Sequence, residues 1–200
     1  MVSTNITEHA YPFSWDVVTR AFWNKYSNPR LSHVERVDVL DRVLDEQGRL
    51  CMCRLAKCTQ NNIPNWAKNL IGGSTSYVYE ESICDPRTKR LKLKSTNLSF
   101  RSVATIEETC VYSVHPNNSQ QTLYRAEAKV SAFIPFISSK LERFSVRSGS
   151  ETAADSIRAI ENICNDIFEG TFAPAMCEKM SNTGSGRHNM HVNETGNAFI

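Results

Sequence analysis

The chain has 200 residues, of which 40% are hydrophobic and 22% are charged, and its formal net charge is +2. This length allows one domain with a substantial core, and the composition is that of a globular protein. Lysine and arginine form no basic block, so we expect no nucleic-acid binding. No run of 18 apolar residues occurs, and the N-terminus lacks the pattern of a signal or transit peptide.

The first predicted element is a helix over residues 14–26. Ser14 suits its N-cap, apolar residues recur at helical spacing, and Asn28-Pro29 ends it. Runs of alternating residues separated by turn residues then predict a series of antiparallel strands. These strands are expected at 34–42, 50–57, 75–82, 90–95, 105–114 and 121–133.

A long connection, residues 58–73, separates the second and third of these strands. It begins with polar residues and ends in Gly72-Gly73. Between them lies a short amphipathic patch formed by Ile63, Trp66, Leu70 and Ile71. On the residues alone, this segment is either a mobile lid or a loop packed permanently on the core.

Residues 137–168 predict the longest helix, and its apolar face changes direction near Gly149. The face that starts the helix continues into Ser148, Thr152 and Asp155, which are polar. Two interpretations stay open: the helix bends and these residues meet solvent, or they line the polar end of a cavity. We expect a domain over 1–172 and a flexible tail over 173–200.

The order of a helix, a meander of strands and a long helix predicts an α+β protein, with one sheet and its helices packed on one face. A curved sheet folded around a long helix leaves an elongated apolar space between them. Such a space suits a greasy ligand.

The seven cysteines show neither a C-x-x-C pair nor the spacing of a zinc site, so we expect free thiols, no metal and no cofactor. No nucleophile elbow, phosphate-binding loop or histidine cluster is present. The acidic pairs Glu80-Glu81 and Glu107-Glu108 occupy adjacent strand positions, which face opposite sides. We interpret them as parts of solvated strands, and we expect that the protein is not an enzyme.

Several short motifs occur together and in a characteristic order. They include FWNKYSNP at 22–29, VDVLDR at 37–42, LIG at 70–72, and DPRTKRLKLKSTNLSF at 85–100. The chain resembles the PRELI-like family of mitochondrial lipid-transfer proteins over roughly residues 5–170, and is most similar to its slowmo branch.

This resemblance implies a START-like fold, in which about seven antiparallel strands curve around a long C-terminal helix and enclose a phospholipid. It also implies a location in the mitochondrial intermembrane space, transient contact with membrane surfaces, and a heterodimer with a small helical twin Cys-x9-Cys protein. The implied cargo is phosphatidylserine or phosphatidic acid, moved between the outer and inner membranes.

The resemblance further implies roles for individual residues. Lys25 and Tyr26 correspond to a basic-aromatic pair that faces the lipid phosphate. If the resemblance is set aside, Lys25 can be interpreted as a solvated lysine at the end of a helix. Arg54 and Lys57 lie on opposite strand faces, so only one is expected to point inward. Further lipid-binding positions, and the lid residues that would contact a membrane, complete the expected site: Lys57, Cys58, Ser148, Thr152 and Asp155, with Ile63, Trp66, Leu70, Ile71, Gly72 and Gly73.

Two departures from the family pattern allow other interpretations. Carriers of phosphatidic acid have a lysine where this chain has Cys58. Related carriers also place basic or amide residues near 148–155, where this chain has Ser148, Thr152 and Asp155. With fewer cations, Asp155 could pair with the ammonium of a serine or ethanolamine head group. Alternatively, the pocket has degenerated, and the protein is a scaffold or a regulatory interaction module.

Overall fold

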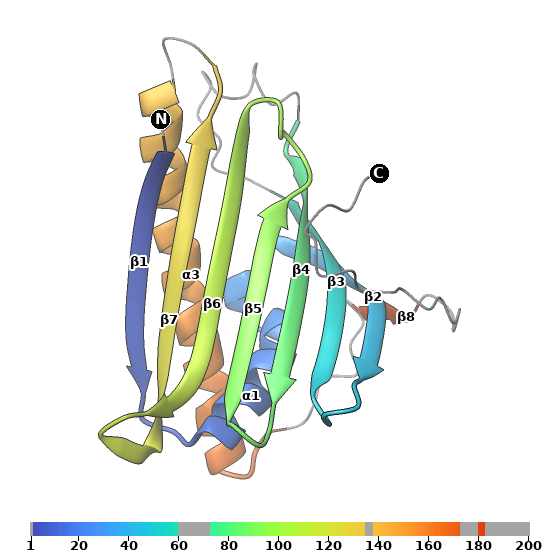
Figure 1. The fold of residues 1–200 in the computed structure, drawn as a ribbon, viewed down its shortest axis with the longest axis vertical. Coiled ribbons are helices and arrows are strands. Elements are labelled where there is room, and N and C mark those ends of the chain that lie inside the picture. Colours follow the sequence, from blue (N-terminus) through green and yellow to red (C-terminus); the bar gives the residue numbers. More distant parts are fainter. Residues whose placement is uncertain (1, 60–72, 135–137, 173–179, 183–200) are drawn as a thin grey trace.

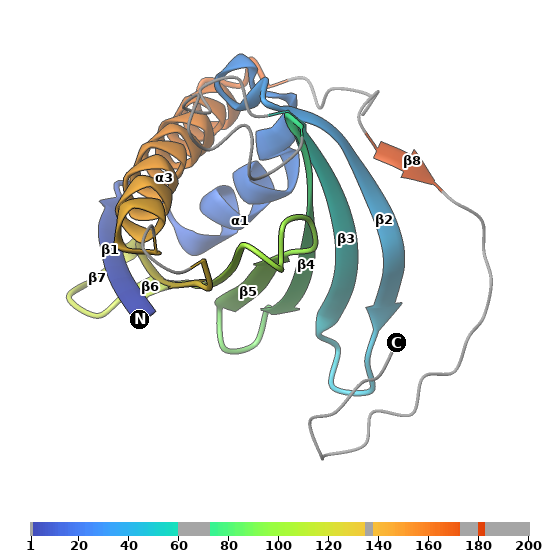
Figure 2. The ribbon, with the colours of Figure 1, turned by 90° about the horizontal axis from the view of Figure 1, so that it is seen from above.

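A strongly curved sheet wraps around two helices in the computed structural model, which describes residues 2–59, 73–134, 138–172 and 180–182. The strand order is β1-β7-β6-β5-β4-β3-β2-β8, in which all neighbours are antiparallel except β2 and β8. Figure 1 shows the strands side by side with α1 and α3 behind them, and Figure 2 shows both helices on the concave side. The expected START-like α+β fold, with about seven antiparallel strands and a long C-terminal helix, is confirmed.

The elements between α1 and α3 follow the predicted ones closely, whereas β1 and β8 were not predicted. The elements are β1 (Val2–Tyr11), α1 (Trp15–Asn24), the 3-10 turns η1 (Lys25–Ser27) and η2 (Pro29–Leu31), β2 (Val34–Leu44), β3 (Leu50–Thr59), β4 (Thr75–Asp85), β5 (Arg90–Asn97), β6 (Ala104–His115), β7 (Asn118–Ala132), α3 (Ser138–Phe168) and β8 (Met180–Asn182). The predicted tail, 173–200, lies outside the described residues except for β8, which pairs with β2.

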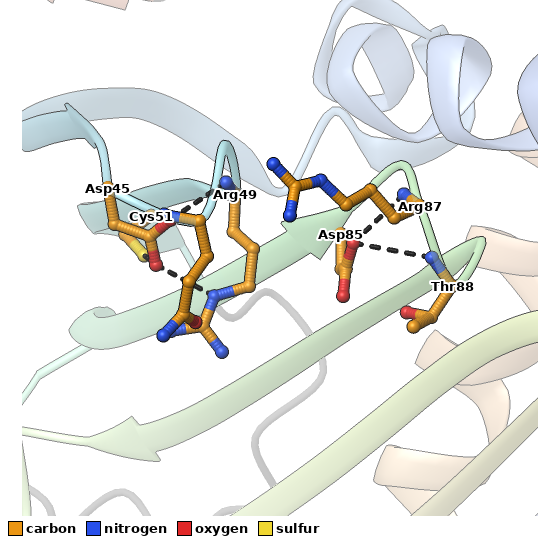
Figure 3. Close-up of polar contacts among 7 residues, drawn as sticks. Asp45, Arg49, Cys51, Asp85, Arg87 and Thr88 are labelled. Atoms are coloured by element: carbon orange, nitrogen blue, oxygen red, sulfur yellow. Dashed lines mark hydrogen bonds and ion pairs between the residues drawn. The ribbon is translucent and has the colours of Figure 1, made fainter.

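Two of the predicted hairpin turns are closed by aspartates in the same way. Asp45 accepts hydrogen bonds from the backbone of Gln47 and Arg49 and forms a 2.7 Å ion pair with the Arg49 side chain. Asp85 accepts from the backbone N–H groups of Arg87 and Thr88. Figure 3 shows the two turns close together at one end of the sheet. These bonds lower the pKa of both aspartates, with the backbone bond from Arg49 as the largest cause at Asp45 and the Thr88 side chain at Asp85.

The hydrophobic core fills the end of the trough where α1 lies. Trp15 and Phe22 of α1 pack against Tyr112 and Tyr124 of the sheet, and the Trp15 indole donates a 3.2 Å hydrogen bond to the Tyr112 carbonyl. Ile160, with other apolar residues from the second half of α3, covers the same cluster. The two helices and the sheet therefore close this end by apolar packing.

Helix α3 runs without interruption past Gly149, and its two halves cover different neighbours. The second half buries Ile160 and Cys164 in the core, whereas the first half buries Leu141 and turns polar positions toward a cavity. The change of apolar face predicted near Gly149 is explained by this division, and not by a break in the helix.

Strand β1 was not predicted, because its pattern is the reverse of a normal half-buried strand. Its inward-facing residues are polar up to Tyr11, and its apolar Val2 and Ile6 face outward, 63% and 53% exposed. A polar inward face is tolerated here because it meets polar residues of α3. Neither helix of the described ranges combines the length and the apolar character that crossing a membrane requires, and the six cysteines in these ranges are free thiols.

Candidate functional site

The half of the trough not filled by the core holds a cavity of about 340 Å³. This volume lies within the range of small-molecule sites, about 300–1,000 Å³. The concave face of the sheet, the turns η1 and η2, and the first half of α3 form its walls. Most of the wall is apolar, with contributions from Leu31, Val34, Val78, Phe100, Val130, Leu141 and Phe144.

A row of residues with polar side chains crosses the sheet where the cavity meets the core. Arg54 on β3, Glu80 on β4, Ser95 on β5 and Glu108 on β6 are successive register partners, and all point to the concave face. We call these four residues the polar row. Since neighbouring strands are about 4.8 Å apart, the row spans roughly 14 Å. It gives the largely apolar cavity a region with charged side chains.

One half of the polar row is a buried ion pair. Arg54 is fully buried, and its Nη2 lies 2.7 Å from Glu80 Oε2, although the angle falls short of a hydrogen bond. The Tyr26 hydroxyl donates a 2.5 Å hydrogen bond to the other Glu80 oxygen. Burial acts to raise the pKa of Glu80, but Arg54 and Lys25 outweigh it, so the net pKa is lowered. Glu80 is therefore held as a carboxylate, and Tyr26 is fixed in orientation.

Lys25 reaches into the same region from η1 and is only 7% exposed. Its ammonium lies 4.9 Å from the ring centre of Phe22 and 4.8 Å from that of Tyr26. Burial lowers its pKa, while Glu80 opposes the shift. Within the described part of the chain Lys25 forms no ion pair, and its amino group lies over two aromatic faces at the edge of the cavity.

Glu108 ends the polar row on the opposite side from Arg54. It lines the cavity, and burial raises the pKa of its carboxyl group, with Lys25 opposing this shift. The Cys110 thiol lies next to it on the same face of β6 and also contacts the Tyr124 hydroxyl at 3.6 Å. Burial therefore disfavours the ionised form of Glu108 unless a positive group lies near it.

The seam between β1 and α3 forms a polar side wall. Three hydrogen bonds cross it: Ser3 to Glu142 at 2.8 Å, Asn5 to Ser150 at 3.2 Å, and His9 with Glu161 at 2.9 Å. Asn5 also lines the cavity, as do the small residues Ser145, Ser148, Gly149, Thr152 and Ser156 of α3. Ser148 and Thr152 are exposed as well and lie two residues from Ser150, so the cavity opens to solvent on the side of α3 that faces away from β1.

Five of the predicted binding residues meet at this cavity: Lys25, Tyr26, Cys58, Ser148 and Thr152. Two others lie elsewhere. Lys57 is on the outer face, where its Nζ is 2.7 Å from Glu35, and Asp155 is absent from the wall and lies 3.9 Å from Arg158. Of Arg54 and Lys57, it is thus Arg54 that points inward.

The predicted lid falls largely outside the described residues, which exclude Ile63, Trp66, Leu70, Ile71 and Gly72. Gly73 is described; it is exposed, and no atom lies within 4 Å of the position that a Cβ would take. The strands that flank the segment do reach the cavity, since Cys58 and Ser76 line it.

Neither acidic residue of the polar row was identified from the sequence as part of the site. The interpretation of Glu80 and Glu108 as parts of solvated strands is wrong, because Glu80 is 5% exposed and Glu108 faces the cavity. Their outward partners, Glu81 and Glu107, do face solvent. Strand parity was the available signal, since Glu80 alternates with Val78 and Ser82, which also point inward.

Known proteins share both this sequence pattern and this fold. The sequence profile described as the PRELI-like family matches residues 16–171. The chain is 31% identical to the protein slowmo homolog of Dictyostelium discoideum, over 68% of this chain and 60% of that protein. It is 36% identical to protein UPS2, mitochondrial, of Saccharomyces cerevisiae, over 73% of this chain and 66% of that protein. The match thus spans under two thirds of either relative.

Solved structures with the same architecture are more distant in sequence. The protein TTHA0849 from Thermus thermophilus superposes with a TM-score of 0.57 at 13% identity, over 82% of this chain and 99% of that one. Norcoclaurine synthase from Thalictrum flavum gives a TM-score of 0.53 at 11% identity, over 83% and 88%. These structures support the fold alone, whereas the sequence profile and the relatives show that this chain belongs to the PRELI-like family.

Proposed function

We propose that this protein is a non-enzymatic phospholipid carrier, which extracts a phospholipid from one membrane and delivers it to another. The observation that supports this most is the buried Lys25 amino group, which lines the cavity and forms no ion pair with any of the described residues. A buried cation is costly unless an anion neutralises it. The phosphate of a lipid head group is an anion that would arrive with the apolar chains that such a cavity suits.

A carrier is needed because a free phospholipid crosses water very slowly. About 30 acyl methylenes at about 0.8 kcal/mol each oppose transfer by roughly 25 kcal/mol. The apolar wall would replace the contacts that the chains lose on leaving the bilayer. A charged head group would go to the polar row and to Lys25, where charged side chains reach the cavity.

In the proposed complex, Lys25 attracts the phosphate and Tyr26 borders it. The buried pair of Arg54 and Glu80 would hold Tyr26 in place, because its hydroxyl already donates to Glu80. Phosphatidylserine and phosphatidic acid are the proposed cargoes. Ser148 and Thr152 would meet the glycerol region from the side of α3.

We further propose that the protein works in the mitochondrial intermembrane space, which agrees with the word mitochondrial in the name of the yeast relative. A small helical twin Cys-x9-Cys protein would be its partner there. The segment 58–73 would serve as lid and membrane contact, since the strands on either side of it end at the cavity. Trp66 is its largest apolar side chain.

A second candidate is a scaffold or regulatory module whose cavity holds no exchangeable lipid. The exposure of Ser148 and Thr152 favours it, because a cavity open to solvent on this side of α3 shields acyl chains less well. The two candidates differ in one measurable property, the movement of lipid between membranes.

The test is transfer of fluorescent phosphatidylserine and phosphatidic acid between donor and acceptor vesicles, by the full chain with its partner protein. Lys25→Met should abolish transfer because it removes the buried cation. The matched control is Lys92→Met on β5, which removes an exposed lysine on the outer face. No transfer of either lipid by a folded wild-type complex would reject the carrier and favour the scaffold.

A further inference from the structure

We propose that Glu108 is the receptor for an ammonium group, so that the cavity favours phospholipids with an amine-bearing head group over phosphatidic acid. This inference rests on the proposed carrier function and assigns a specificity-determining residue within it. It also moves the ammonium-binding role from Asp155, which does not line the cavity, to the opposite wall.

There is room for a ligand group in front of the Glu108 side chain. Its register partners on the neighbouring strands are Ser95 and Ala128, which are small and line the same cavity. Small neighbours leave space above the carboxylate for a ligand group. Glu107, the preceding residue, points to the outer face and cannot reach this space.

The charged groups around the cavity also favour this assignment. Arg54 and Glu80 form an ion pair and neutralise each other. The remaining charged groups in this region are Lys25 and Glu108, and neither forms an ion pair within the described part of the chain. Both side chains line the same cavity, so a single ligand could contact the two of them.

A separated cation and anion match a head group that carries a phosphate and an ammonium on a short link. Ethanolamine and serine head groups have this form, whereas phosphatidic acid has a phosphate and no amine. With phosphatidic acid bound, Glu108 would face a phosphate directly and would have to take up a proton or repel it. The Glu108 carboxylate thus attracts lipids that carry an amine and disfavours phosphatidic acid, which carries none.

The raised pKa of Glu108 agrees with this assignment. Burial destabilises its carboxylate in the empty cavity, and an ammonium ligand would restore the ionised form. As a purely structural residue, Glu108 would contribute little to the stability of the fold, because an apolar side chain would suit this part of the wall better.

The experiment compares Glu108→Gln with Glu107→Gln, which removes the same charge from the outer face of the same strand. Vesicles containing equal amounts of phosphatidylserine, phosphatidylethanolamine and phosphatidic acid are offered to each complex, and the transferred lipids are quantified by mass spectrometry. Glu108→Gln should shift the ratio of amine-bearing lipids to phosphatidic acid by about tenfold toward phosphatidic acid, since a charge-assisted hydrogen bond is lost. Glu107→Gln and Glu108→Asp, which keeps the charge, should retain the wild-type ratio.

An unchanged ratio in Glu108→Gln, or an equal shift in Glu107→Gln, would overturn the assignment while leaving the carrier function intact. Lipid transfer by wild type is measured in the same experiment. Its absence would overturn the proposed function, and this inference with it.

Discussion

The buried pair of Arg54 and Glu80 makes a sharp prediction for Glu80→Gln. This change keeps the shape of the side chain and an oxygen that can accept from Tyr26, but it leaves the fully buried Arg54 without its counter-ion. Loss of one partner of a buried pair costs about 3–5 kcal/mol. At about 2–4 °C per kcal/mol for a domain of this size, the midpoint of thermal unfolding should fall by roughly 6–20 °C.

The assay is thermal unfolding followed by circular dichroism, with Glu35→Gln as the matched control. Glu35 forms an ion pair of the same length, 2.7 Å, with Lys57, but both side chains are about 40% exposed. The control should therefore change the midpoint far less. The double change Arg54→Met with Glu80→Leu should recover most of the loss, because apolar groups can replace a buried pair. Equal midpoints for Glu80→Gln and Glu35→Gln would refute this reasoning.

Four further outcomes follow from the structure. Gly149→Ala should raise the free energy of unfolding by about 1 kcal/mol in urea denaturation, because Gly149 lies inside α3 and no atom lies within 4 Å of the added Cβ; a loss of stability would contradict this. Lys25→Met should stabilise the lipid-free protein by about 0.5–2 kcal/mol while abolishing transfer, since the buried ammonium serves the ligand; destabilisation would count against that role. Trp66→Ala should slow extraction of lipid from vesicles, and an unchanged rate would exclude Trp66 from membrane contact. The pKa of Glu80 is lowered from 4.5, so the stability that its carboxylate contributes should be fully present above pH 4.5 and should decline as the pH falls below that value. In urea titrations, wild type should therefore lose stability more steeply in acid than Glu80→Gln.

The fold could be predicted from the sequence where hydrophobic pattern and turn chemistry agree. Strand β5 shows this directly, since buried Leu91 and Leu93 alternate with exposed basic residues between two clear turns. Strand β1 could not be found in the same way. Its inward residues Asn5 and His9 are polar because they bond to α3, so its pattern depends on helix residues 145 and 152 positions away in the chain.

The site shows the same limit. Lys25 and Tyr26 were identified through family resemblance, and the structure places both at the cavity. Arg54 and Glu80 lie opposite each other on neighbouring strands. The sequence does not give the register in which these strands pair, so it did not indicate an ion pair between the two residues. Lys57 was included because it lies beside Cys58, at which related carriers have a lysine, but strand parity puts it on the outer face with Glu35.

The central claim is that the cavity holds a phospholipid, and it is tested most directly by the lipid that copurifies with the protein. The complex would be purified without detergent, extracted, and analysed by mass spectrometry for phospholipid per protein, with Lys25→Met purified in parallel. We predict close to one phospholipid per wild-type protein, rich in amine-bearing head groups, and a much lower content in Lys25→Met. Wild-type protein that folds, binds its partner and contains no phospholipid would contradict the account.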